Sequence, residues 1–413
     1  MKYAIIIPDG CADLPLVSLG ERTPMQAART PNLDALAQSG IVGRSFNVPP
    51  DFSPGSDVAT LGLLGYDPSH YYTGRAPLEA IAQNIVLKPD DWAIRCNLVT
   101  VVNGFMKSFT AGHISTDEAT ELIRCLNETI TVASPTPIRF QAGVSYRNLA
   151  VVCGKNLFSG ATVTFPPHDF TDKPIGPALP TGDGSAWLRQ LMEESKNVFA
   201  EHPVNRRRIN LGILPATQIW LWGLGRLPQL PPFGEKYQSA TGGRILRGAM
   251  ITAVDLLRGI AKSIGWDSID VPGITGYIDT DYAAKGRYAA VALQDYDIVC
   301  VHVEATDEAG HEGNVEKKVQ AMEDIDAKVV PPIVDALRSY GDWRLLVSPD
   351  HPTPIVHKTH TSDFVPWLIV GSDIVSDASN TFDESTAEHS AMQFDHGHEM
   401  LESFMGYIRQ KSR

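Results

Sequence analysis

Short apolar segments that lead into Asp, His or Ser residues constrain this chain more than any other feature. The polar residues lie in four places, at 7–10, 54–59, 304–311 and 348–361. A short apolar run bounded by turn residues, as at 2–8 and 298–303, is typical of a buried strand. Because the carboxyl ends of parallel strands meet at one edge of a sheet, we expect the four loops to converge there.

Strand-like and helix-like patterns alternate along much of the chain. We expect strands at 2–8, 218–223, 297–303, 343–348 and 365–370, and helices at 31–39, 253–264, 282–293 and 315–337. Strands that alternate with helices predict the α/β class, a mostly parallel sheet with helices on both faces.

The segment 89–204 differs, because strand patterns follow one another and residues 166–184 are rich in Pro and Gly. Both borders contain proline, at Pro89 and Pro203. We therefore expect an inserted α+β domain at 89–204 within a discontinuous catalytic domain, 1–88 and 205–413. The metal-ligand candidates given below all lie outside the insertion, so we expect the insertion to bind substrate as a cap.

Charge and cysteine content exclude several classes of protein. The formal charge of −13, from 35 basic and 48 acidic residues, argues against a nucleic-acid partner. No apolar run is long enough for a membrane span, and no signal-peptide pattern opens the chain. The five cysteines are scattered and form no C-x-x-C pair. We expect a cytoplasmic protein that acts on a small molecule and has no membrane partner.

The four loops hold residue types that bind divalent metals. Carboxylate and imidazole groups suit Mn²⁺, Zn²⁺, Co²⁺ or Fe²⁺, and an Asp and a His four residues apart can face one ion from one helical turn. The candidate ligands are Asp9, Asp307, His311, Asp350, His351 and His360. Two ions held in this way can clamp a phosphoryl group, which predicts a metal-dependent phosphoryl-transfer enzyme.

Ser56 is the candidate nucleophile. A free serine hydroxyl is a weak nucleophile, and a metal ion together with the N–H groups of a helix N-terminus would activate it. Each signal is weak alone, because a lone Asp-Gly is usually a turn and a Ser at a helix start is usually an N-cap. The prediction depends on all four loops occurring together.

The chain resembles the archaeal type of cofactor-independent phosphoglycerate mutase, within the alkaline phosphatase superfamily, over essentially its whole length. The motifs that carry the resemblance are Pro54–Ala59 with Leu64–Pro68, Gly74–Glu79, Trp220–Gly223, His302–Glu304, Asp307–His311 and Pro349–Pro354. The resemblance implies an alkaline phosphatase-like catalytic domain, two divalent ions and a phosphoserine intermediate at Ser56. Mn²⁺ is the first choice of ion, with Zn²⁺, Co²⁺ and Mg²⁺ as alternatives.

The resemblance also implies how the ligands divide. One ion belongs to Asp307, His311 and His360, and the other to Asp9, Ser56, Asp350 and His351. The anion contacts follow less directly from motifs. Our candidates for binding the small phosphorylated substrate are Arg75, Arg95, His113, Arg147, His168 and Lys285, since guanidinium groups suit carboxylate and phosphate alike.

Three reactions stay open at this point. A phosphoglycerate mutase would interconvert 2-phosphoglycerate and 3-phosphoglycerate. The stretch Ser108–Ser115 lacks the arginines of the archaeal pattern, and a bacterial branch that resembles this chain has been proposed to act as a homoserine kinase. A plain metal-dependent phosphatase is the third, and it would need an open site.

Overall fold

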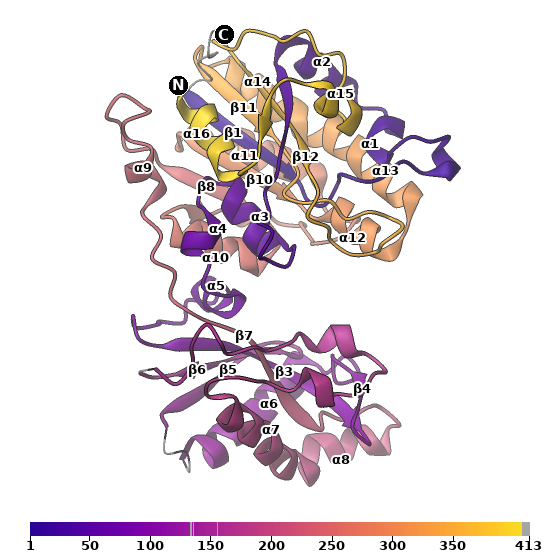
Figure 1. The fold of residues 1–413 in the computed structure, drawn as a ribbon, viewed down its shortest axis with the longest axis vertical. Helices are drawn as coiled ribbons and strands as arrows, with labels where there is room; N and C mark the ends of the chain where they lie inside the picture. Colours follow the sequence, from indigo (N-terminus) through magenta and orange to yellow (C-terminus); the bar gives the residue numbers. More distant parts are fainter. Residues whose placement is uncertain (133, 135, 155, 407–413) are drawn as a thin grey trace. The chain divides into compact units, whose positions relative to one another are not determined.

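The computed structural model describes residues 1–132, 134, 136–154 and 156–406. The chain forms two compact units: unit 1 comprises residues 1–72 and 229–413, and unit 2 comprises residues 73–228. Each unit has a sheet of its own (Figure 1). Each also has a hydrophobic core of its own.

Unit 1 is built on an eight-stranded sheet in the order β13-β2-β12-β11-β1-β10-β8-β9. The central pairs from β11 to β9 are parallel, and β12 runs antiparallel to both β11 and β2. The strands are β1 (Lys2–Pro8), β2 (Ile41–Ser45), β8 (Gly248–Ile251), β9 (Asp267–Ser268), β10 (Ile298–Val303), β11 (Trp343–Val347), β12 (Val365–Gly371) and β13 (Gln393–Phe394). The predicted α/β class, with a mostly parallel sheet, is confirmed.

Helices cover both faces of this sheet. Alternate strand residues such as Ile6 and Val301 share one core with residues of α11, α13 and α14, whereas the ring of Tyr3 packs on Phe404 of α16. The main helices are α2 (Pro31–Ser39), α3 (Ser56–Leu63), α10 (Asp255–Ser263), α11 (Tyr282–Ala292), α12 (Ala305–Glu312), α13 (Val315–Asp324), α14 (Val330–Arg338), α15 (Glu384–His389) and α16 (His398–Gly406). Short helices are α1 (Pro24–Ala27), α4 (Pro68–Tyr71) and α9 (Phe233–Lys236).

The long helix expected at 315–337 contains a π-helical turn, Ile325–Val329, between α13 and α14. Pro331 and Pro332 follow this turn. Proline has no backbone N–H to donate to the preceding turn, so the regular hydrogen-bond pattern is interrupted there.

Unit 2 is an α+β unit with an antiparallel five-stranded sheet in which β3 pairs with β4, β6 and β7, and β6 pairs with β5. The strands are β3 (Trp92–Val102), β4 (Phe105–Ser108), β5 (Ile138–Val144), β6 (Arg147–Val152) and β7 (Gln218–Arg226). The helices are α5 (Arg75–Ala82), α6 (Thr116–Leu126), α7 (Ser185–Ala200) and α8 (Pro203–Asn210).

The boundaries differ from those expected at 89 and 204. Strand β7, which we expected in the catalytic sheet, pairs along its length with β3 and so belongs to unit 2. Helix α5 also packs against β3 and β7. The Pro- and Gly-rich stretch at 166–184 is part of unit 2, where Met106 N donates to Lys173 O and Val163 exchanges hydrogen bonds with Thr181.

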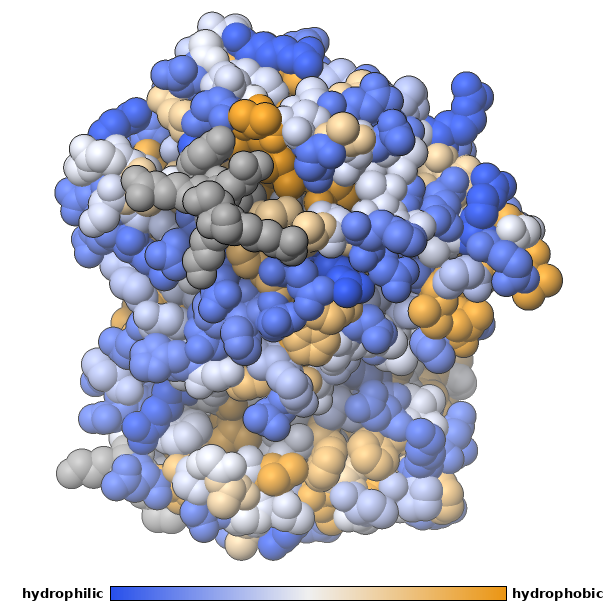
Figure 2. Space-filling model, turned by 45° about the horizontal axis from the view of Figure 1, so that its top comes forward, coloured by the Kyte–Doolittle hydropathy of each residue, from blue (hydrophilic) through white to orange (hydrophobic). Residues whose placement is uncertain are grey.

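Hydrophilic side chains cover most of the face drawn in Figure 2, and hydrophobic ones lie there in small groups. Across the described residues, no helix combines the length and the apolar character needed to cross a bilayer.

Candidate metal and nucleophile site

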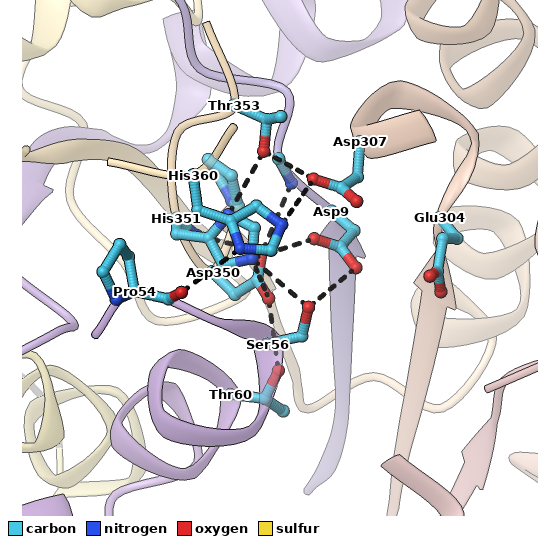
Figure 3. A network of polar contacts seen from close by, with 12 residues as sticks. Asp9, Pro54, Ser56, Thr60, Glu304, Asp307, Asp350, His351, Thr353 and His360 are labelled. Atoms are coloured by element: carbon cyan, nitrogen blue, oxygen red, sulfur yellow. Dashed lines mark hydrogen bonds and ion pairs between the residues drawn. The ribbon is translucent and has the colours of Figure 1, made fainter. Parts of the chain in front are cut away.

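Three neighbouring strands of unit 1 carry the predicted ligands just beyond their carboxyl ends. Strand β1 lies between β10 and β11. Asp9 follows β1, Asp307 lies in the first turn of the helix after β10, and Asp350 follows β11. As expected from the parallel arrangement, the structure brings these loops together, with Ser56 beside them at the start of α3 (Figure 3).

The first ligand group, called site A, consists of Asp307, His311 and His360. Each histidine has Nδ1 on a backbone carbonyl: His311 on Lys358 O at 3.1 Å and His360 on Pro54 O at 3.2 Å. A carbonyl only accepts, so Nδ1 of each ring carries the proton, and Nε2 of each neutral ring has a free lone pair.

Those two Nε2 atoms are 2.9 Å apart, and each lies 3.2–3.3 Å from an oxygen of Asp307. Lone pairs and a carboxylate that converge at such distances repel one another unless a proton or a cation lies between them. In the chain alone a proton takes this place, since the hydrogen bond to Asp307 raises the pKa of His311 to about 9. Burial favours a raised pKa for Asp307, but the hydrogen bonds of both histidines outweigh it and hold that pKa well below its usual range. Site A therefore fits a divalent cation.

The second group, site B, consists of Asp9, Asp350 and His351, all fully buried. Asp9 Oδ1 has no hydrogen-bond partner among the described residues. Burial, followed by the nearby charges of Asp350 and Asp307, raises the pKa of Asp9 well above its usual range. In the chain alone a proton relieves the repulsion between these carboxylates. Both can be ionised only beside a cation, so site B fits one as well.

Ser56 lies next to Asp9 and His351 of site B. Its Oγ is 3.4 Å from Asp9 Oδ2 and 3.2 Å from His351 Nε2. Gly55 precedes the helix in an extended conformation, which leaves Ser56 as the first residue of α3. The first backbone N–H groups of a helix have no intrahelical partner, so negative charge on Oγ is favoured there.

Several side chains hold site B in place. Asn47, which is buried, donates from Nδ2 to Asp350 O at 2.9 Å and to Pro349 O at 3.3 Å. Its Oδ1 accepts from Ser45 Oγ at 2.9 Å. Thr60 Oγ1 donates to Asp350 Oδ2 at 3.4 Å. Asn47 and Thr60 were not predicted as site residues, because bonds between distant segments leave no pattern in the sequence.

Three of the predicted anion contacts form an arginine cluster within unit 2. Arg95 Nε lies 3.0 Å from Glu79 Oε2, and Arg75 Nε lies 3.4 Å from Glu79 Oε1. Burial lowers the pKa of Arg95 to about 10, and the neighbouring Arg75 and Arg147 act in the same direction. Three guanidinium groups thus lie close together, and guanidinium groups suit carboxylate and phosphate anions.

The other three candidates lie elsewhere. The ring of His168 packs on Trp222, over which the guanidinium of Arg95 also lies, so His168 borders the arginine cluster. The structure places His113 as an exposed residue. Lys285 belongs to unit 1 and is fully buried, and its Nζ donates to His302 O at 2.7 Å. Lys285 is therefore a backbone contact beside the metal ligands.

His302 was not among the predicted site residues. Its Nε2 lies 2.8 Å from Asp9 Oδ2, and its Nδ1 lies 3.2 Å from Thr252 Oγ1. Burial lowers the pKa of His302 to about 3, so the ring is neutral. Asp9, His302 and Glu304 form a third group with the spacing of metal ligands. The available signal was one imidazole within the apolar strand Ile298–Val303.

Comparison with known proteins places these features in one family. A family model described as 2,3-bisphosphoglycerate-independent phosphoglycerate mutase matches residues 37–205. A mutase of that name from Methanothrix thermoacetophila is 46% identical over 404 residues, covering 97% of this chain and 98% of the relative. A Geobacter sulfurreducens protein, named as a probable 2,3-bisphosphoglycerate-independent phosphoglycerate mutase, is 43% identical over 410 residues. The match covers 98% of this chain and 100% of the relative.

Solved structures agree with the sequence relatives. The cofactor-independent phosphoglycerate mutase from Thermoplasma acidophilum is 27% identical with a TM-score of 0.65, covering 98% of this chain and 100% of that one. A Pyrococcus horikoshii protein is also 27% identical, with a TM-score of 0.80 and coverage of 98% and 96%. On these relationships, the chain belongs to the family of 2,3-bisphosphoglycerate-independent phosphoglycerate mutases.

Proposed function

We propose that the protein interconverts 2-phosphoglycerate and 3-phosphoglycerate through a phosphoryl group carried on Ser56. The observation that carries the proposal is the position of Ser56 Oγ, within 3.4 Å of Asp9 and 3.2 Å of His351 at the start of a helix. Membership of the mutase family supports the choice of substrate.

In the first step, Ser56 Oγ loses its proton and bonds to phosphorus, as the ester oxygen of the substrate leaves and takes up a proton. In the second step, the other hydroxyl of the bound glycerate loses its proton and bonds to the same phosphorus, as Ser56 Oγ leaves and takes up a proton. The two half-reactions balance without a second phosphate donor. The phosphoserine must also be kept from water between the steps, or it would hydrolyse.

We propose that sites A and B each hold one divalent cation, with Mn²⁺ as the first candidate. When bound, the cations lower the pKa of the serine hydroxyl and stabilise charge on the phosphoryl oxygens. Within the chain, Asp9 and His351 orient Ser56 Oγ, and the free N–H groups of α3 face the developing charge.

We propose that the arginine cluster of unit 2 binds the carboxylate of the substrate. Arg75 and Arg147 supply charge, and Arg95 is held in place by Glu79 and by Trp222. Replacing Arg147 with Ala should raise KM with a smaller effect on kcat, since this contact is the same in ground and transition states. Arg139, an exposed residue on the neighbouring strand, provides the matched control.

The test is to incubate the purified protein with Mn²⁺ and 3-phosphoglycerate and to follow phosphorus NMR. We expect 2-phosphoglycerate to appear up to equilibrium without added 2,3-bisphosphoglycerate and without release of inorganic phosphate. A second sample contains homoserine and ATP. Phosphohomoserine in that sample, with no isomerisation in the first, would overturn the proposal in favour of a kinase. Inorganic phosphate as the main product would indicate a phosphatase.

A further inference from the structure

His302 connects three neighbouring strands at the carboxyl edge of the unit 1 sheet. It lies in β10 and pairs with Ile7 of β1. Thr252 directly follows β8, the next strand on the other side. Asp9 follows β1. The contacts Thr252–His302–Asp9 therefore run across the edge of the sheet into site B, and all three residues are buried.

The direction of each hydrogen bond in this row follows from the partners of Thr252 and Asp9. Val254 N donates to Thr252 Oγ1 at 3.1 Å. Among the described residues, the one other hydrogen-bond partner of Thr252 Oγ1 is His302 Nδ1 at 3.2 Å, so the hydroxyl proton of Thr252 points to Nδ1. The other ring nitrogen agrees, because His302 Nε2 lies 2.8 Å from a carboxylate oxygen of Asp9, which accepts. An Nδ1 that accepts carries no proton, so the neutral ring must carry its proton on Nε2.

We propose that His302 is a positioning residue, held as its Nε2-protonated tautomer by Thr252, which donates to Asp9 Oδ2 and leaves Asp9 Oδ1 free for the cation of site B. This tautomer is the opposite of that in His311 and His360, whose Nδ1 atoms face carbonyls. His311 and His360 can therefore offer Nε2 to a cation, whereas His302 cannot.

The same reasoning decides the role of the third group, Asp9, His302 and Glu304. Both ring nitrogens of His302 are used in hydrogen bonds, and Nε2 is a donor, so the ring has no lone pair for an ion there. Glu304 Oε2 lies 4.0 Å from His302 Nδ1. We therefore assign His302 and Glu304 as neighbours that hold Asp9 in place, and we assign no cation to this third group. Sites A and B then account for two cations per chain. The count rests on the proposed function, whereas the tautomer does not.

The first test needs neither metal nor substrate. In apo-protein labelled with ¹⁵N-histidine, long-range ¹H–¹⁵N spectra at neutral pH distinguish a protonated from a bare ring nitrogen, and His302→Gln identifies the signals of residue 302. We expect bare Nδ1 and protonated Nε2. A protonated Nδ1 at His302 would overturn the proposal. Thr252→Val, which removes the hydroxyl that donates to His302 and accepts from Val254 N, should produce a mixture of tautomers. Thr100→Val, at a buried threonine of unit 2, should leave the spectrum unchanged.

The second test measures Mn²⁺ binding by calorimetry. His302→Leu should weaken one of two Mn²⁺ sites about 10- to 100-fold and leave the other unchanged, as is usual when the partner of a metal ligand is removed. His302→Gln, whose amide can still donate to Asp9, should recover most of that loss. Unchanged affinity in His302→Leu, or a third Mn²⁺ in the wild type, would overturn the proposal. If the wild type shows the predicted tautomer but binds no Mn²⁺, the proposed metal site is overturned and the tautomer assignment stands.

Discussion

Lys318 of α13 forms a buried ion pair with Asp13 in the loop after β1 and a hydrogen bond with the loop after β11. Removing its charge tests how much this buried pair stabilises unit 1. Lys318 Nζ donates to Asp13 Oδ2 at 2.7 Å and to Thr353 O at 2.8 Å, and both side chains are fully buried. Replacing Lys318 with Met fills nearly the same volume, so the main effect is an unpaired buried carboxylate.

Removing one partner of a buried pair typically costs about 3–5 kcal/mol. Asp13 keeps two backbone donors, Leu14 N and Ile355 N, so we expect the lower end, about 3 kcal/mol. The matched control is Lys317→Met on the same helix. That lysine pairs with Glu312, and both side chains are about one-third exposed, so its loss should cost about 0–1 kcal/mol.

The assay is urea unfolding of the apo-protein, read by hydrogen exchange of peptides from β1 and β10, because these strands report on unit 1 alone. A Lys318→Met protein whose free energy of unfolding lies within about 1 kcal/mol of the wild type would refute the reasoning. The double variant Lys318→Met with Asp13→Asn removes the unpaired charge and should be more stable than Lys318→Met alone.

Three further predictions concern unit 1. Gly10→Ala should abolish Mn²⁺ binding at site A, because Gly10 has φ +61° and an added Cβ would lie 2.6 Å from the Asp307 carboxylate. The control is Gly20→Ala, at φ +68° with open space around it, which should leave Mn²⁺ binding intact by calorimetry. Asn47→Asp would turn a carboxylate toward two carbonyls and should weaken site B about 10- to 100-fold in the same assay, with binding at site A as the reference. Burial raises the pKa of Glu384 from 4.5 to about 7, so the folded state binds this proton more tightly than the unfolded state. The free energy of unfolding should therefore fall as pH rises from about 4.5 to 7. Glu384→Gln should reduce that fall by about 2 kcal/mol in urea unfolding between pH 5 and pH 8, and an unchanged pH dependence would refute the prediction.

The arrangement of the site could be predicted because it follows from strand order. Once the strands ending near Asp9, Val303 and Val347 are taken as parallel, their loops must meet at one edge. The chemistry of Asp and His then indicates a metal, and the structure does bring the six candidate ligands into two groups. Most candidates lie directly beyond a strand or in the first turn of a helix, where local patterns mark them. His311 lies in the last turn of α12, and His360 lies in the loop between β11 and β12.

The division between the units could not be predicted in the same way. Strand β7 is an apolar run with no local mark of its partner, and only its pairing with β3, more than 100 residues earlier, assigns it to unit 2. The burial of Lys285 is a similar case, since a lysine near a site suggests an anion contact until its carbonyl partner is known. Hydrogen bonds from Asn47 and His302 also join segments far apart in sequence.

The most direct test of the central claim is to trap the phosphoryl group on Ser56. The wild-type protein with Mn²⁺ and 3-phosphoglycerate is quenched in acid during turnover, digested and examined by mass spectrometry. We predict a phosphoryl group on Ser56, its absence together with loss of turnover in Ser56→Ala, and normal labelling in the control Ser53→Ala, an exposed serine of the same loop. Normal isomerisation by Ser56→Ala, or a phosphoryl group on another residue during turnover, would contradict the account.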